Sequence, residues 1–173
     1  MFKSYRFFLI FVVFVCGYYI FGYNKKNIEV APINLTKKNV CVYDSMILIY
    51  YNGPKAQILW NDGSRSFYCE VREAFYDSLD TLKNKRIKAF FVQDFSELTW
   101  GSYTDKWVSA HNAYYVIDSN KDGAMGVTYV PFTNLTSAKK FLKSYGGILL
   151  KFSEINFDTL SVSADLLKNR VIY

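Results

Sequence analysis

Histidine, cysteine and methionine are all scarce in this chain of 173 residues, and their scarcity narrows the chemistry that it can perform. The single histidine, His111, excludes a multi-histidine zinc or Cu(II) site within one chain. There are three cysteines, and Cys16 lies inside a long apolar run, so we do not expect a disulfide framework. Positive residues exceed acidic ones by only six and are scattered along the chain, so the charge pattern does not indicate that the protein binds nucleic acid.

Apolar and aromatic residues are abundant by contrast. Hydrophobic residues make up 51% and charged residues 21%, which is enough apolar material for a core and excludes disorder for most of the length. Aromatic residues make up 19%, a composition that favours β-rich structure. The length allows one ordinary domain or two very small ones.

The first 23 residues are predicted to be a membrane anchor. Lys3 and Arg6 precede an apolar stretch over residues 7–23, and the 18 uncharged residues before Lys25 would span about 27 Å as a helix. No pair of small residues marks a signal-peptidase site, and Val15 stands before Cys16 where a lipoprotein site needs a small residue. We therefore expect an uncleaved anchor with the rest of the chain outside the cytoplasm; the alternative is a buried core helix.

The remainder is predicted to be an α+β protein of two tandem ββαβ units packed together. A polar linker over residues 24–38 precedes a first unit at about 39–96, a second unit at about 105–156 and a weakly helical tail over 157–173. Neither unit alone is large enough to bury a good core, so the two should share one. In the first unit, strands are expected at 40–51, 56–60, 65–69 and 87–95, with a helix at 70–82. In the second, we expect a long strand or strand pair at 106–118, a loop at 123–126, a strand at 127–132, a helix at about 137–145 and a strand at 146–155.

The two internal methionines are candidates for a metal site. Met46 and Met125 lie outside any broad apolar stripe, each beside small or polar residues near a turn. Thioethers are soft, uncharged ligands that suit Cu(I), which also accepts thiolate and imidazole. The alternative is that both fill gaps in the core.

Other chemistry-bearing residues are less distinctive. Cys69 is interpreted as a small buried hydrophobic residue, because nothing places it near His111 to form a Cys–His hydrolase. His111 alternates with apolar residues and is either a surface or a ligand position. The segment 118–123 begins like a calcium loop, but Tyr129 stands where that loop needs glutamate, so a polar turn is expected.

Several motifs together resemble the NosL family. They include Gly53-Pro54-x-Ala56-Gln57-Ile58, the strand Ala113-Tyr114-Tyr115-Val116 and the loop Gly123-Ala124-Met125-Gly126. The resemblance extends over about residues 40–155. It implies a periplasmic Cu(I)-binding accessory protein that delivers copper to nitrous oxide reductase, and a fold of two ββαβ units similar to part of organomercurial lyase.

The resemblance also implies a set of copper ligands. The family motif Cys-x-x-Cys-Gly-Met matches Cys41 and Met46, while Asp44 and Ser45 stand where the second Cys and the Gly are expected. Met125 matches the methionine of the second unit. The ligands are then drawn from Met46, Met125, Cys41 and His111, with Asp44 as a hydrogen-bond acceptor for His111 or as a charge that faces the partner.

The expected function is that of a membrane-tethered Cu(I) chaperone and not of an enzyme. Its partners would be the copper ion, nitrous oxide reductase with its membrane maturation machinery, and the membrane itself. One alternative is a thiol-dependent lyase, which would need two cysteines beside an acid; Cys41, Cys69 and Asp44 are the available residues. A further alternative is a metal-free scaffold that docks maturation partners.

Overall fold

Two antiparallel β-sheets, each accompanied by a helix, organise the chain in a computed structural model that describes residues 29–161. The first sheet and its helices comprise β1 (Ala56–Trp60), β2 (Arg65–Tyr68), α2 (Val71–Leu79), α3 (Thr81–Asn84), β3 (Ile87–Gln93) and β4 (Trp107–Ser109). The second comprises β5 (Tyr114–Ile117), β8 (Val130–Phe132), α4 (Leu135–Tyr145) and β9 (Ile148–Lys151). The remaining elements are β6 (Asp122–Gly123), β7 (Gly126–Val127), α5 (Phe157–Ser161) and the 3-10 turns η1 (Leu48–Tyr50), η2 (Ala110–Asn112) and η3 (Phe152–Glu154).

The two sheets have corresponding topologies. The strand order is β2-β1-β3-β4 in the first sheet and β8-β5-β9 in the second, and every pairing is antiparallel. In each half the first strand is central, the second strand flanks it on one side, and the strand after the helix flanks it on the other. The predicted α+β class is confirmed, and this shared strand order agrees with the predicted repeat of ββαβ units.

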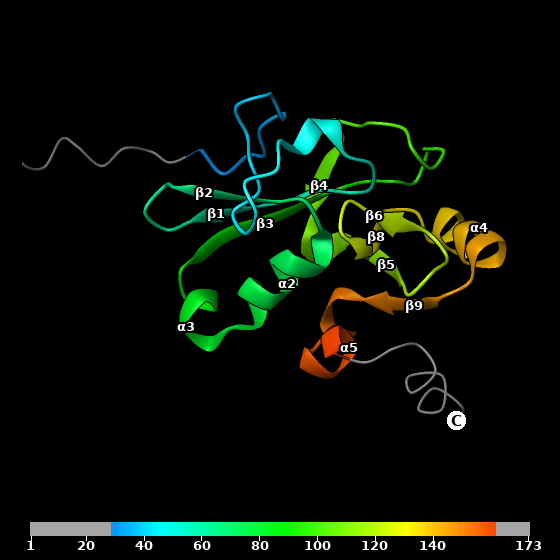
Figure 1. Cartoon of the computed structure of the whole chain (residues 1–173). Coiled ribbons are helices and arrows are strands. Elements are labelled where there is room, and N and C mark those ends of the chain that lie inside the picture. Colours follow the sequence, from blue (N-terminus) through cyan, green and yellow to red (C-terminus); the bar gives the residue numbers. More distant parts are fainter. Residues whose placement is uncertain (1–28, 162–173) are drawn as a thin grey trace, which may run out of the picture.

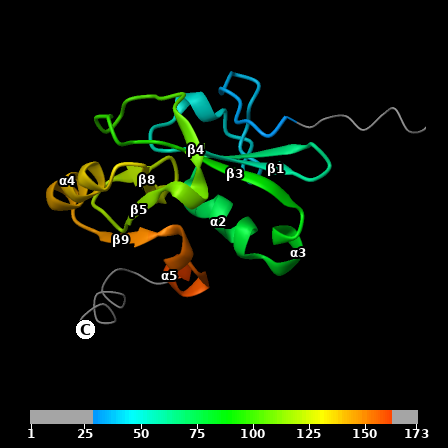
Figure 2. The same cartoon turned by 180° about the vertical axis from the view of Figure 1, so that it is seen from behind.

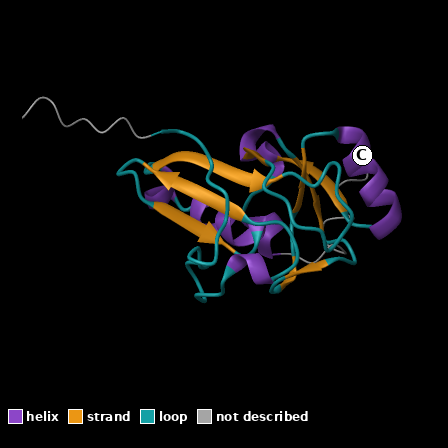
Figure 3. Cartoon of the chain, turned by 90° about the horizontal axis from the view of Figure 1, so that it is seen from above, coloured by secondary structure: helices purple, strands orange, loops and turns teal. Residues whose placement is uncertain are grey.

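The halves lie side by side and share a core. Figures 1 and 2 show the β1–β2–β3 sheet beside the β5–β8–β9 sheet, with α2 against the first and α4 against the second. Seen from above, α4 lies at the opposite end of the molecule from the β1–β2 hairpin (Figure 3). The Phe75 ring of α2 lies between the halves, with ring centroids 5.1 to 6.0 Å away in β3, in β5, in the loop before β8 and in η3. Those partners are Phe90, Tyr115, Tyr129 and Phe152.

The helix predicted at 70–82 ends early. It stops at Leu79, because the next residue, Asp80, leaves the helical conformation and accepts hydrogen bonds from the amides of Leu82 and Lys83. This side chain therefore caps a new short helix, as aspartate does at helix N-termini. Leu82, which was expected on the apolar face, is 79% exposed as a result.

The strand predicted at 40–51 is wrong. This segment is a turn closed by a single bridge between Val40 and Ile47, followed by η1. The cause lies in its middle: Asp44 accepts a hydrogen bond from the Met46 amide at 2.9 Å, and Ser45 has φ +63°. Aspartate and serine favour such turns over strands, so the apolar residues around them do not continue as a ladder.

The strand region predicted at 106–118 is divided between the sheets. The 3-10 turn η2 separates β4, which pairs with β3, from β5, which is the centre of the second sheet. The expected loop at 123–126 is the turn of a small β6–β7 hairpin. Within residues 29–161, no helix is long and apolar enough to cross a membrane. The predicted anchor and most of the tail lie outside the described residues.

One carboxylate joins the ends of the two halves and allows a stability prediction. Asp94, buried after β3, accepts hydrogen bonds from Ser96 and Thr133 and forms an ion pair with Lys106. Burial opposes ionisation, but the hydrogen bonds outweigh it and hold the pKa of Asp94 below its usual value. Asp94→Asn replaces one acceptor oxygen by a donor, so we expect a loss of about 3 kcal/mol in the free energy of unfolding at neutral pH.

The pH dependence follows from the lowered pKa. The contribution of Asp94 is complete above the pKa of an unfolded aspartate, about 3.9, and disappears as pH falls through the lower folded pKa. Urea unfolding should therefore separate parent and Asp94→Asn at neutral pH and bring them together in acid. Asp105→Asn, at an exposed aspartate, is the matched control. Equal stabilities of parent and Asp94→Asn at neutral pH would contradict this assignment.

Candidate metal centre

Two cysteines and one glutamate meet where β2 leads into α2. Cys41 comes from the turn before η1, Cys69 from the link between β2 and α2, and Glu73 from the first turn of α2. Their ligand atoms all lie within 4.8 Å of one another. Glu73 Oε2 lies 3.6 Å from Cys41 Sγ and 3.4 Å from Cys69 Sγ, and the Cys69 amide donates to Cys41 Sγ at 3.4 Å. Both sulfur atoms belong to buried side chains.

Hydrogen bonds hold the turn that carries Cys41 against β2 and α2. The Cys41 amide donates to the Met46 carbonyl across the turn, and the Val42 amide donates to the Phe67 carbonyl of β2. The hydroxyl of Tyr43 donates to Asp77 of α2 at 2.6 Å. Cys41 is therefore fixed beside Cys69 even though 28 residues separate them.

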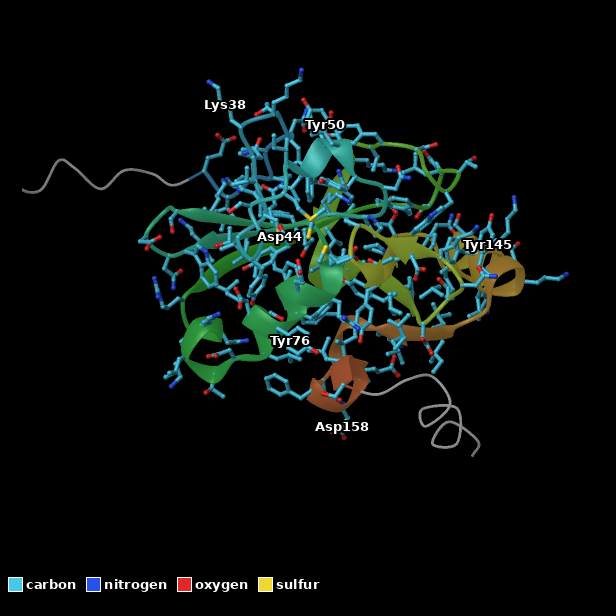
Figure 4. All side chains as sticks on the ribbon, viewed as in Figure 1. Lys38, Asp44, Tyr50, Tyr76, Tyr145 and Asp158 are labelled. Carbon is cyan, nitrogen blue, oxygen red and sulfur yellow. The ribbon has the colours of Figure 1, made fainter. Side chains whose placement is uncertain are left out.

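Asp44 faces the same cluster. Its Oδ1 accepts the Met46 amide at 2.9 Å, and its Oδ2 lies 3.6 Å from Cys69 Sγ. Figure 4 shows sulfur atoms beside Asp44, close to the start of α2. Asp44 thus contacts a cysteine and orients the backbone of Met46, rather than accepting a hydrogen bond from His111.

The turn that carries Met125 approaches the cluster from the second half. Met46, which is half-buried, and Ala124 both pack against an apolar cluster that contains Cys41 and Cys69. Met125 follows Ala124 at the β6–β7 turn; its amide donates to Glu70 at 2.9 Å, and the residue is 56% exposed. The structure therefore brings the segments of both predicted methionines to the cysteine pair.

His111 lies elsewhere. Its ring packs against Phe152, with 3.9 Å between ring centroids, on an exposed part of η2 beside Lys151. Among the described residues, the group of closely spaced potential ligands contains Cys41, Cys69 and Glu73 but not His111. The histidine that the sequence offered as a possible ligand is therefore not brought to this cluster.

The two thiols differ in acidity. A hydrogen bond from Cys69 lowers the pKa of Cys41, against the opposing effect of burial. The same hydrogen bond, with burial and the nearby carboxylates, raises the pKa of Cys69 well above its usual value. The pair therefore tends to hold one proton on Cys69, with Cys41 as the more readily ionised sulfur.

A buried lysine lies behind the cluster. Lys55 Nζ donates to the carbonyls of Asn52 and Gly53 at 2.7 and 2.8 Å. Burial lowers the pKa of Lys55 to about 8, while the negative charge of Glu70 and of the two cysteines opposes that shift. A positive group at this depth offsets part of the negative charge that the thiolates and carboxylates would accumulate.

This set of atoms combines soft and hard ligands. Thiolates and thioethers favour Cu(I), whereas carboxylate oxygens favour harder ions. Sequence reasoning missed Glu73 altogether and placed Cys69 only in the alternative lyase site, not among the copper ligands. The available signal was that Cys41 and Cys69 are the two cysteines outside the N-terminal apolar run, and that Glu73 follows Cys69 by four residues at the start of a predicted helix.

Comparisons with known proteins identify the family of the chain. A family model described as NosL matches residues 32–160. The copper-binding lipoprotein NosL of Achromobacter cycloclastes is 31% identical over 133 residues, which cover 73% of this chain and 68% of the relative. The protein of the same name from Stutzerimonas stutzeri is 28% identical over 140 residues, which cover 80% of this chain and 73% of the relative.

A solved structure extends the similarity to three dimensions. The crystal structure of the copper chaperone NosL from Shewanella denitrificans superimposes with a TM-score of 0.69 at 27% identity. The match covers 73% of this chain and 96% of that one. The family model spans residues 32–160, which include the cysteine cluster, and one curated relative is 31% identical; the chain therefore belongs to the NosL family.

Proposed function

We propose that this chain is a membrane-tethered, extracytoplasmic protein that binds Cu(I) and delivers it for the maturation of nitrous oxide reductase. The observation that carries the proposal is the convergence of Cys41 and Cys69 with the segments of Met46 and Met125 in one apolar cluster. Soft sulfur ligands in such surroundings suit Cu(I). The names of the relatives, which refer to copper binding and to a copper chaperone, support the same assignment.

The arrangement suggests how copper would be held and released. The two thiols are buried, whereas Met125 is 56% exposed at the tip of the β6–β7 turn. Met125 is therefore the outermost ligand and the one that an acceptor's ligand replaces first. Binding also displaces the proton held by Cys69, since the metal requires a thiolate.

The tether rests on the apolar N-terminal segment. Residues 7–23 are long enough to span a bilayer, and two relatives are named lipoproteins, which fits a position at a membrane surface. This chain has Val15 before Cys16, so we propose a retained helix in place of a lipid. The full-length protein should stay in the membrane pellet after an alkaline carbonate wash. Recovery of a shortened soluble form, or of a chain acylated at Cys16, would contradict the tether.

A Cu(I) titration of the full-length chain in detergent, against a chromophoric Cu(I) competitor, tests copper binding. We expect tight binding of one ion. Met46→Leu and Met125→Leu should each lower the affinity by at least about tenfold, or 1.4 kcal/mol, because leucine conserves size and removes the sulfur. Leu142→Met, which adds a thioether on α4, is the matched control and should leave the affinity unchanged. If the parent does not compete for copper, the docking scaffold is favoured. If both methionine variants bind copper like the parent, Met46 and Met125 only fill space in the core.

A second candidate function is cleavage of a carbon–mercury bond. The observation that favours it is the position of Asp44 Oδ2, 3.6 Å from Cys69 Sγ in a pair of buried thiols. Two thiolates would chelate the mercury of an organomercurial cation, and Asp44 would take the proton that Cys69 gives up on binding and pass it to the carbon. The carbon–mercury bond breaks, the hydrocarbon leaves, and Hg(II) stays on the two sulfurs without any change of oxidation state. Release of benzene from phenylmercury by the parent, and its loss in Asp44→Asn, would support this activity; no benzene release would exclude it.

A further inference from the structure

A buried glutamate connects the Met125 turn to the cysteine pair. Glu70 follows Cys69 directly, is only 3% exposed, and accepts the Met125 amide on Oε1 at 2.9 Å across 55 residues of sequence. Its Oε2 has no hydrogen-bond partner among the described residues. The buried hydroxyl of Thr128 lies beside this carboxylate, outside hydrogen-bond geometry, and is likewise unpartnered there. A buried carboxylate with a single direct hydrogen bond is costly, so its position calls for an explanation.

Close backbone packing explains why the turn can reach Glu70. A Cβ added at Gly123 would lie within 2.8 Å of three carboxylate atoms of Glu70, the nearest contact being too short for any real side chain. Gly123 also packs closely against Gly53, since a Cβ added at Gly53 would lie 2.8 Å from Gly123 Cα. Gly123 is thus packed against both Glu70 and the turn before β1, and a bare backbone is required at this point.

We propose that Glu70 is the positioning residue that docks the Met125 turn beside Cys41 and Cys69, so that the copper site is assembled from both halves of the chain. Glu70 contacts the backbone of Met125 and not the metal, and acts through the placement of that methionine. This proposal adds a positioning residue to the proposed function. It rests on that function wherever the test measures copper affinity.

A double-mutant cycle on copper affinity tests the coupling. Glu70→Ala should lower Cu(I) affinity about as much as Met125→Leu, roughly tenfold, and the double variant should lose no more than either single one. Glu70→Gln keeps an acceptor oxygen and should bind within about twofold of the parent. Glu97→Ala, which removes an exposed negative charge, is the control and should also match the parent. Additive losses in the double variant would overturn the positioning role and leave the proposed function standing.

A second measurement needs no copper. Gly123→Ala should lower the melting temperature by about 3 °C or more in the parent, because the new methyl group collides with Glu70. In the Glu70→Ala background the same substitution should have little effect, since the colliding carboxylate is gone. If Gly123→Ala destabilises both backgrounds equally, Glu70 does not hold this turn. A parent that fails to bind copper while this rescue is observed would refute the proposed function but not the docking contact.

Discussion

Replacing Cys69 by serine is expected to weaken Cu(I) binding by at least about a hundredfold, which corresponds to about 2.8 kcal/mol. Cys69 Sγ is buried and lies within 4.8 Å of both Cys41 Sγ and a Glu73 oxygen. A hydroxyl conserves the hydrogen bond to Glu73 but is a poor ligand for a soft ion, whereas a thiolate is a strong one. Competition with a chromophoric Cu(I) chelator, at several competitor concentrations, would measure the change.

Two further variants separate ligation from packing. Cys69→Ala removes the sulfur without adding a polar group and should lose copper to the same extent as Cys69→Ser. Ser78→Ala alters another small buried side chain, on α2 away from the cluster, and should bind copper like the parent. If Cys69→Ala keeps its affinity while Cys41→Ser loses it, Cys69 is the small hydrophobic residue that its sequence context indicates and the site depends on Cys41 alone.

Periodicity predicted the parts of the fold where local and tertiary preferences agree. The strand beginning at Ile87 and the helix ending at Tyr145 lie where the sequence places them, because the apolar residues of the strand face the shared core and those of the helix face a second apolar cluster. The strand expected at 40–51 failed, since the short-range hydrogen bond of Asp44 to the Met46 amide outweighs the β propensity around it. The pairing of β4 with the first sheet, while β5 belongs to the second, could not be predicted. It depends on η2, a three-residue turn that has no distinctive sequence pattern.

In the candidate site, too, the sequence predicted some residues correctly, whereas others depend on tertiary contacts. Met46, Met125, Cys41 and Asp44 were identified from residue type and family motif, and the structure places their segments together. Cys69 was interpreted as a core residue because nothing in the sequence places it near His111, and its four-residue spacing from Glu73 is a weak signal by itself. Its role depends on a turn 28 residues earlier in the chain, and this is a tertiary contact. For His111 the error is in the other direction: its residue type suggested a metal ligand, but its ring packs against Phe152, outside the cysteine cluster.

Glu73→Gln is expected to separate zinc binding from copper binding. The parent should prefer Cu(I) to Zn(II) by orders of magnitude, because sulfur ligands dominate the cluster. Zn(II), however, accepts carboxylate oxygens as well as thiolates, and Glu73 Oε2 lies 3.4 to 3.6 Å from both sulfurs. Removing this charge should lower Zn(II) affinity by about a hundredfold while Cu(I) affinity changes by less than about threefold. Competition titrations with a chelator specific for each metal would measure the two affinities.

Substitutions of the sulfur ligands should affect Cu(I) binding more than Zn(II) binding, the opposite of the result expected for Glu73. Met125→Leu removes a thioether that zinc does not use, so Cu(I) affinity should fall by about tenfold while Zn(II) affinity stays the same. Asp44→Cys places a third thiol where Asp44 Oδ2 lies 3.6 Å from Cys69 Sγ, and should tighten Cu(I) binding and slow its transfer to an acceptor. Asp44→Asn should have a modest effect on Cu(I), since a carboxylate is a poor ligand for this ion. A parent that prefers Zn(II), or a Glu73→Gln variant that loses both metals equally, would show that the carboxylates hold the ion and that the cluster is not selective for copper.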